Sequence, residues 1–202
     1  MLMYGLPANT LINQPLYKKT VFEKFNLKTA ERDRFDADIS RMALVARVSS
    51  ATVLALTKGK EIEGFYVLQV ALKRKDYDSK NILLLQKLIP QKMVFAMQYE
   101  EQTQFCIFHT RLQQSEWMPT SEAAIPLQGL SVDDVWNNIV AIIGGLDAQA
   151  EETVEEQILN REQREKLLFQ IESLEKRCRT EKQTRKKFEL HQQLIKLKEK
   201  LK

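Results

Sequence analysis

The C-terminal part of the chain contains no residue that would break a helix. The last Gly is Gly145 and the last Pro is Pro126, and residues 146–202 are rich in Glu, Lys, Arg, Gln and Leu. These residues are good helix formers, and one continuous helix of that length would extend about 85 Å, at about 1.5 Å per residue. A body made of residues 1–145 is too small to cover such a helix. We therefore predict a globular domain at 1–145 and a helical tail at 146–202 that serves assembly.

The composition is that of a folded protein in a reducing compartment. The chain has 202 residues, of which 44% are hydrophobic, and this size fits one domain plus an appendage. Its apolar stretches are far shorter than the roughly 20 residues of a membrane span, and the N-terminus lacks the features of a signal peptide. Cys106 and Cys178 are distant in the sequence, so no disulfide framework is indicated. We expect a cytoplasmic protein without a transmembrane helix.

Residues 1–145 alternate between helical and strand-like patterns. Helical patterns occupy residues 15–27, 30–41, 80–88 and 131–143. Strand-like runs occupy residues 42–48, 62–73, 92–99 and 104–111, with a short edge strand at 116–119. The last helix carries its own start signal, because Ser131 precedes it and Asp134 follows three positions on. We predict an α+β body with about four or five mainly antiparallel strands and helices on one face.

Two short coiled-coil seams lie in the tail. Both follow 4, 3, 4 spacing, the first at Leu167, Ile171, Leu174 and Cys178, the second at Leu190, Leu194, Leu197 and Leu201. The seams differ in phase, so they cannot belong to one undisturbed heptad register. The tail is therefore either a straight helix with two binding stripes or a helical hairpin that bends near residues 179–187 and packs its halves together.

The absence of Gly, Pro and Asn near that bend favours the straight helix. For either form of the tail, two packing arrangements of the seams remain possible. They pack against the body, or they form a coiled coil with a second copy or with another protein.

The segment between the seams is strongly basic. Seven of the twelve residues at 176–187 are cations, namely Lys176, Arg177, Arg179, Lys182, Arg185, Lys186 and Lys187. Glu181 is the single acid among them, so the segment carries +6 in a chain whose net charge is +4. Three interpretations remain open: a solvated polar face, a contact with nucleic acid, or a contact with an acidic protein surface. Phe188 is the one nearby aromatic residue, so stacking on bases is not indicated.

The sequence contains no recognisable catalytic or metal-binding signature. The two histidines, His109 and His191, have no Cys, Asp or Glu at the spacing of a metal site. No glycine-rich phosphate loop and no nucleophile elbow occurs. Cys106 is interpreted as a core residue on a strand. We therefore expect no metal ion and no cofactor.

One group of polar residues surrounds the central strand. It consists of Glu61, Glu63, Gln69, Lys73, Arg74, Lys75, Asp76 and Asp78. Metal-dependent nucleases of the restriction-enzyme type place acids and a Lys on such a strand, because Mg²⁺ needs carboxylate oxygens and the Lys positions or polarises a water molecule. Here Gln69 and Ala71 stand where an acid is required. A divergent nuclease is the alternative function, and a solvated strand end is the simpler interpretation.

A second acidic group, Asp33, Asp36 and Asp38, lies in the predicted helix at 30–41. We interpret this group as the surface of a helix rather than as a metal site.

Four segments together resemble a bacterial family that is known as a domain of unknown function. They are LPANTLINQPLYKKTVFEKFNL, FYVLQVALKRKDYDSKNILLLQKLIP, KMVFAMQYEEQTQFCIF and EKQTRKKFELHQQLIKLKEKL. The resemblance covers nearly the whole chain. Members look to be encoded beside SWI/SNF-type helicases and DNA methyltransferases in restriction or phage-defence clusters, which implies an accessory subunit. Members often carry acids where this chain has Gln69 and Ala71, and the resemblance implies no catalytic residue.

We therefore expect a non-enzymatic accessory or adaptor subunit of a bacterial DNA-processing complex. Its α+β body would dock one partner, and its tail would bind another protein chain, either a helicase or methyltransferase subunit or a second copy. The basic segment at 176–187 would contact DNA or an acidic partner. The two seams and the charge between them motivate this expectation.

Overall fold

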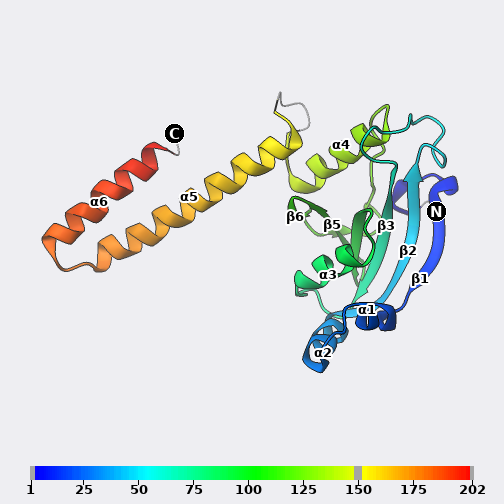
Figure 1. The fold of residues 1–202 in the computed structure, drawn as a ribbon, viewed down its shortest axis with the longest axis horizontal. Coiled ribbons are helices and arrows are strands. Elements are labelled where there is room, and N and C mark those ends of the chain that lie inside the picture. The colour runs from blue at the N-terminus through cyan, green and yellow to red at the C-terminus, as the bar shows by residue number, and fades with distance from the viewer. Residues whose placement is uncertain (1–2, 148–151, 201–202) are drawn as a thin grey trace. The chain divides into compact units, whose positions relative to one another are not determined.

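A computed structural model describes residues 3–147 and 152–200 of the chain (Figure 1). The chain forms two compact units, Met1–Gln149 and Ala150–Lys202. The first unit contains the sheet and four α-helices, and the second contains two α-helices.

The first unit is built on one mixed sheet. Its strands are β1 (Leu11–Leu16), β2 (Ile39–Ser49), β3 (Gly64–Leu72), β4 (Lys92–Tyr99), β5 (Gln102–His109), β6 (Arg111–Gln114) and β7 (Met118–Pro119). The first six follow one another across the sheet in chain order, and β7 pairs with β5. Two short 3₁₀ turns, η1 (Met3–Gly5) and η2 (Ala8–Thr10), precede β1. The sheet is larger than the four or five strands expected.

The pairing between β3 and β4 is parallel, whereas every other pair of neighbouring strands is antiparallel. The chain leaves the end of β3, forms helix α3 (Lys80–Leu88) and returns to begin β4 beside the start of β3. A helix between two neighbouring strands is the ordinary connection for a parallel pair. The sheet is therefore mainly antiparallel, as expected, but it is mixed, because the crossover helix α3 brings the chain back to run parallel to β3.

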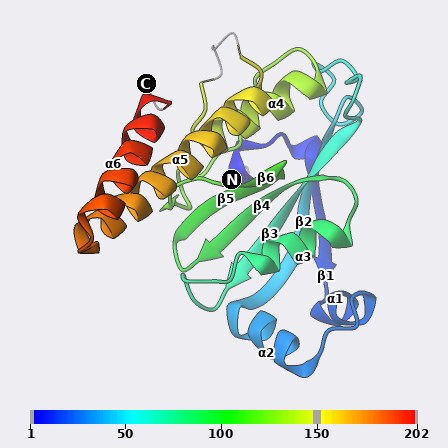
Figure 2. The ribbon, with the colours of Figure 1, turned by 60° about the vertical axis from the view of Figure 1, so that its left-hand side comes forward.

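Helix α3 and the two preceding helices pack on one face of the sheet. Helices α1 (Lys18–Lys24) and α2 (Thr29–Asp38) lie together at one end of the sheet, and α3 crosses in front of the strands (Figure 2). A buried cluster joins these elements, including Phe35 of α2, Leu68 of β3 and Leu85 of α3. Alternate residues of β3 face this cluster because side chains alternate across a strand. Burial of this face holds the three helices to the sheet.

Helix α4 (Val132–Gly144) packs on the opposite face. Phe65 of β3 alternates with the residues of the first cluster, and its ring lies 5.5 Å from that of Trp136 in α4. Helix α4 also contacts β5 and β6. The expectation of helices on one face is therefore wrong, because Phe65, Val67 and their neighbours make the second face of the sheet apolar enough to need cover as well.

The start of α4 confirms the predicted cap. The Ser131 hydroxyl accepts a hydrogen bond from the Asp134 backbone N–H at 3.1 Å, and the Asp134 carboxylate accepts one from the Ser131 N–H at 3.0 Å. These hydrogen bonds hold the pKa of the Asp134 carboxyl below its usual range, with the Ser131 side chain as the largest cause. Each partner thus satisfies a backbone donor that the helix itself leaves unpaired.

Replacement of Ser131 by Ala removes this cap. We expect Ser131→Ala to lower the free energy of unfolding by about 1 kcal/mol, which is typical of a lost N-cap. Urea unfolding followed by circular dichroism measures the change. Ser121→Ala is the matched control, because Ser121 is exposed and outside any helix. Equal stability of the Ser131→Ala variant and the wild type would contradict the role of the cap.

The N-terminal elements differ from the predicted helix at 15–27. Residues Leu11–Leu16 form strand β1 at the edge of the sheet, and the helix that follows is only Lys18–Lys24. Pro15 lies in this edge strand, where a missing backbone N–H is tolerated. The proline, which was interpreted as a helix start, therefore belongs to a strand.

The second unit is a helical hairpin. Helix α5 (Val154–Thr180) and helix α6 (Thr184–Glu199) are separated by the three residues 181–183 and contact each other. The hairpin alternative is therefore correct, and the preference for one straight helix is wrong. Side chains end α5 without Gly or Pro: the Thr180 hydroxyl donates to the carbonyl oxygens of Lys176 and Arg177, both at 3.2 Å. Such local hydrogen bonds compete with continuation of a helix.

The turn itself is also fixed by a side chain. Glu181 has an extended backbone, and its carboxylate accepts a hydrogen bond from the Gln183 N–H at 2.9 Å.

The phase of the seams gives a second reason for the bend. On a straight helix of 3.6 residues per turn, the Ile171 and Leu194 seams would lie roughly 140° apart, so one partner helix could not cover both.

Candidate functional site

The seam residues that the structure describes are buried or half-buried, and Ile158 of α5, which is off the seams, is also buried with 2% of its surface exposed. Ile171 and Leu194 are buried, with 7% and 8% of their surface exposed. Five other seam positions are half-buried: Leu167, Leu174, Cys178, Leu190 and Leu197. Leu201 lies outside the described residues. Phe169 and Phe188, which are off the seams, are 73% and 64% exposed. The side chains of the two seams thus meet the packing needs of the hairpin itself.

An ion pair links the two helices of the hairpin. Lys198 Nζ of α6 lies 2.8 Å from Glu175 Oε1 of α5. The hydrogen bond from Lys198 holds the pKa of the Glu175 carboxyl below its usual range. The pair is partly exposed, so it fixes the alignment of the helices more than it stabilises them.

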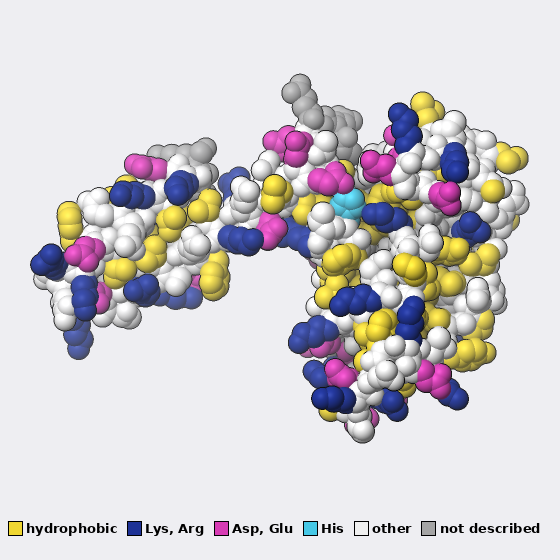
Figure 3. Space-filling view, in the orientation of Figure 1, with side chains coloured by type: hydrophobic (Ala, Val, Ile, Leu, Met, Phe, Trp, Pro, Cys, Tyr) yellow, Lys and Arg dark blue, Asp and Glu magenta, His cyan; other side chains and the backbone are white. Residues whose placement is uncertain are grey.

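The hairpin brings the seven predicted cations to one end. We call this group the basic tip; it consists of Lys176, Arg177, Arg179, Lys182, Arg185, Lys186 and Lys187. Three belong to the end of α5, one to the turn and three to the start of α6. All seven are exposed, and Lys and Arg side chains gather at the turn end of the hairpin (Figure 3). The turn therefore concentrates charge that a straight helix would spread along about 18 Å.

Few acids neutralise the basic tip. Lys176 pairs with Glu172 at 2.7 Å, and Arg185 pairs with Glu189 at 3.5 Å. The remaining five cations form no ion pair with another residue that the structure describes, although Arg179 is near enough to Glu175 for a weaker electrostatic attraction. The tip thus keeps most of its positive charge available to a partner.

The dipole of α6 adds to this charge. The first turn of α6 contains Arg185, Lys186 and Lys187 and no acid, and Gln183 at the N-cap makes no side-chain capping bond. Cations at a helix N-terminus repel the positive end of the helix dipole, typically by 0.3–1 kcal/mol each. An anion bound at the tip would relieve that repulsion as well as the repulsion among the cations.

The predicted polar group around Lys73 does not converge on one place. Glu61 and Glu63 precede β3, and Lys73 follows it, so the two ends lie about 30 Å apart along the strand. Lys73 Nζ is 3.8 Å from Asp36 Oδ2, and Lys75 Nζ donates to Gln102 at 2.7 Å. In residues 3–147 and 152–200 no group of three or more His, Cys, Asp or Glu has the arrangement of a metal site.

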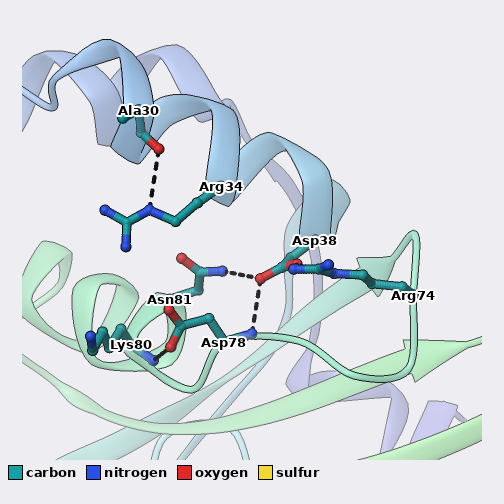
Figure 4. A network of polar contacts seen from close by, with 7 residues as sticks. All are labelled: Ala30, Arg34, Asp38, Arg74, Asp78, Lys80 and Asn81. Carbon is teal, nitrogen blue, oxygen red and sulfur yellow. Dashed lines mark hydrogen bonds and ion pairs between the residues drawn. The ribbon is translucent and has the colours of Figure 1, made fainter.

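Asp38 has a structural role that the sequence analysis missed. It was interpreted as part of a helix surface, but its side chain is completely buried at the end of α2. One carboxylate oxygen pairs with Arg74, and the other accepts hydrogen bonds from the Asp78 backbone N–H at 2.9 Å and from Asn81 Nδ2 at 2.7 Å (Figure 4). The carboxylate therefore ties the end of α2 to the loop after β3 and to the start of α3.

Asp36, in contrast, behaves as predicted for a helix surface. Its carboxylate is half exposed and pairs with Lys18 and Lys73. The hydrogen bond from Lys18 is the largest cause that holds the pKa of the Asp36 carboxyl below its usual range.

Cys106 is a core residue, as predicted. It is fully buried on β5, and this burial raises the pKa of its thiol to about 11. The hydroxyl of Tyr77 lies 3.3 Å from its sulfur, and burial also raises the pKa of Tyr77. A thiol with a raised pKa is a poor nucleophile, because the thiolate is the reactive form.

The two cysteines should therefore differ strongly in reactivity. With iodoacetamide at pH 8 and native conditions, we expect Cys178, which is partly exposed in α5, to be alkylated while Cys106 stays unmodified. Mass spectrometry of the digested protein measures both sites in one sample. In denaturant both should react at similar rates. Alkylation of Cys106 in the native protein as fast as that of Cys178 would contradict its burial.

None of the described helices is both long enough and apolar enough to cross a membrane.

No curated protein and no solved structure matches the chain. A family model does match it, over residues 4–201, which include both the sheet unit and the hairpin. The chain therefore belongs to the family described as Domain of unknown function (DUF4391).

Proposed function

We propose that this protein is a non-enzymatic accessory or adaptor subunit of a bacterial DNA-processing complex of the restriction or phage-defence type. The basic tip of the hairpin contacts DNA, and the sheet unit docks a protein partner. The observation that carries the proposal is the set of five exposed cations at the tip that are without an ion-pair partner among the described residues. Such a cluster attracts phosphate groups over a distance set by the salt concentration.

The geometry favours a binding role over a catalytic one. The tip presents point charges on a rigid pair of helices and has no aromatic platform within it, which suits contact with the DNA backbone rather than with bases. The residues near Lys73, which a nuclease would require, are engaged in other contacts: Lys73 with Asp36 and Arg74 with Asp38. The nuclease alternative therefore gains no support from a specific contact.

The protein partner is a subunit encoded beside this chain, a helicase or a DNA methyltransferase. The family resemblance described above motivates this choice. Because the hairpin carries the basic tip, which we assign to DNA, the sheet unit is the part that docks the partner.

Co-purification tests the adaptor role. The full-length chain with an affinity tag is co-expressed with the helicase or methyltransferase encoded next to it, and the complex is isolated at 0.5 M NaCl, where weak ionic contacts are screened to within roughly 5 Å. We expect a stable complex both for the wild type and for a variant with Arg177, Arg179, Arg185 and Lys186 changed to Glu. Failure of every neighbouring subunit to co-purify would contradict the adaptor role. Loss of the complex in the charge-reversal variant alone would assign the tip to the protein partner instead of DNA.

A further inference from the structure

A groove lies on the sheet at the first three strands. It has a volume of about 660 Å³, which is within the usual range for small-molecule sites. Strand β1 and the preceding turn provide apolar walls through Met3, Leu11 and Ile12, and β2 and β3 provide Ala43 and Gln69. Met3 and Leu11 are 39% and 38% exposed, so apolar surface faces the groove from its rim.

The strand register shows which side chains share this face. Arg41 is opposite Ala71, and Ala43 is opposite Gln69, in the antiparallel pair of β2 and β3. Arg41 and Gln69 are therefore diagonal neighbours, with Cα atoms roughly 7–8 Å apart. The two alanines between them leave space above the sheet, because their side chains end at Cβ. Arg41 and Gln69 both line this space.

Gln69 presents hydrogen-bonding groups in a fixed arrangement. Its side-chain amide is hydrogen-bonded to that of Gln98 on the neighbouring strand β4. Whichever of the two amides donates, the pair leaves one carbonyl oxygen and one amino group without a partner among the described residues. Gln69, which lines the groove, thus offers one free hydrogen-bonding group there, and the other free group belongs to Gln98 beside it on β4.

Arg41 supplies the charge of the groove. It is exposed, its side chain makes no hydrogen bond or ion pair with another described residue, and it is the one charged residue among the described residues that line the groove. A planar guanidinium binds a phosphate through two parallel hydrogen bonds. One cation matches one phosphate group, whereas a strand of nucleic acid needs a row of cations and aromatic platforms.

We propose that this groove binds a nucleoside monophosphate. The edge of the base contacts the free oxygen and amino group of the Gln69–Gln98 pair, because nucleobases carry adjacent donors and acceptors on their edges. The faces of the base lie against Met3 and Leu11, and the phosphate binds Arg41. This site is separate from the DNA contact proposed for the basic tip and does not depend on it.

Isothermal titration calorimetry with the full-length chain tests the site. The probes are AMP, GMP, CMP and UMP, each compared with its nucleoside. We expect saturable binding of at least one monophosphate, with about tenfold weaker binding of the nucleoside and of the monophosphate to Arg41→Gln. Arg47→Gln is the matched control, since it removes the same charge from the same strand outside the groove and should leave affinity unchanged.

Two further measurements separate the alternatives. Gln69→Glu is close to isosteric and should also weaken binding, because it places a carboxylate beside the phosphate site; circular dichroism verifies its fold. If this variant fails to fold, the affinities of the wild type for each monophosphate and for its nucleoside still show whether the phosphate contributes to binding. No saturable binding of any monophosphate at millimolar concentration would overturn the proposal. Binding of a single-stranded tetranucleotide through Arg41 without binding of monophosphates would overturn it as well.

Discussion

Replacement of Asp38 by Ala is expected to destabilise the sheet unit by about 3 kcal/mol, the largest effect of any single substitution considered for this protein. The Asp38 carboxylate is completely buried and accepts hydrogen bonds from Arg74, Asp78 and Asn81. Removing it leaves the Asp78 N–H and the Asn81 amide without their acceptor in a place that water reaches poorly. A buried donor without a partner costs about 1–3 kcal/mol.

The matched control is Asp36→Ala, two residues earlier on the same helix. Asp36 is 54% exposed and pairs with Lys18 and Lys73 at the surface. Surface ion pairs contribute at most about 1 kcal/mol, so this variant should stay close to the wild type. Thermal unfolding by circular dichroism measures both, with an expected fall in Tm of about 10 °C for Asp38→Ala. Equal effects of the two substitutions would contradict the structural role of Asp38.

The local elements of the body could be predicted well from the sequence. Helix α3 begins at Lys80 and ends at Leu88, as predicted, because Asp78 and Ser79 precede it and Pro90 stops it. The cap of α4 at Ser131 was also predicted, since the capping box depends only on Ser131 and on Asp134 three positions later in the sequence. Strands β3 and β4 were found from their β-branched and aromatic residues.

The long-range features could not be predicted in the same way. Burial of Asp38 depends on Arg74 and Asn81, which approach it only after the sheet has formed. Strand β1 was missed because its register with β2 is set by tertiary pairing, and its sequence contains Pro15 and few apolar residues. The hydrogen bond between Gln69 and Gln98 joins residues on neighbouring strands and leaves no signal in the sequence.

The tail contains one feature that was predicted correctly and one that was predicted wrongly. The difference in phase between the Leu167 and Leu190 seams correctly indicated an interruption within residues 179–187, where α5 ends and α6 begins. The form of the break was predicted wrongly, because Gly, Pro and Asn were taken as the main breakers. Thr180 and Glu181 end the helix through their own side-chain hydrogen bonds.

Charge reversal at the basic tip is expected to have the largest effect on DNA binding. Changing Arg177, Arg179, Arg185 and Lys186 to Glu shifts the net charge of the chain from +4 to −4 and removes four of the seven cations of the tip. Each lost phosphate contact lowers the slope of log K against log salt by about 0.9 for double-stranded DNA. Loss of all four contacts would therefore lower the slope by about 3.6 and weaken binding strongly at low salt.

The control carries the same change in net charge at another place. Lys19, Lys58, Lys60 and Lys87 are exposed residues of the sheet unit, and their replacement by Glu alters the charge of the chain equally. If DNA is held at the tip, this variant should keep nearly the slope of the wild type. A loss of affinity without a change in slope would then reflect general repulsion from DNA.

The salt dependence of DNA binding by these three full-length proteins tests the central claim most directly. Fluorescence anisotropy with a labelled duplex, measured between about 50 and 200 mM NaCl, gives the slope for each protein. We expect a steep slope for the wild type and for the control at Lys19, Lys58, Lys60 and Lys87, and a slope lower by about 3.6 for the variant at Arg177, Arg179, Arg185 and Lys186. Equal slopes for the tip variant and the wild type, or no binding by the wild type at the lowest salt, would contradict it.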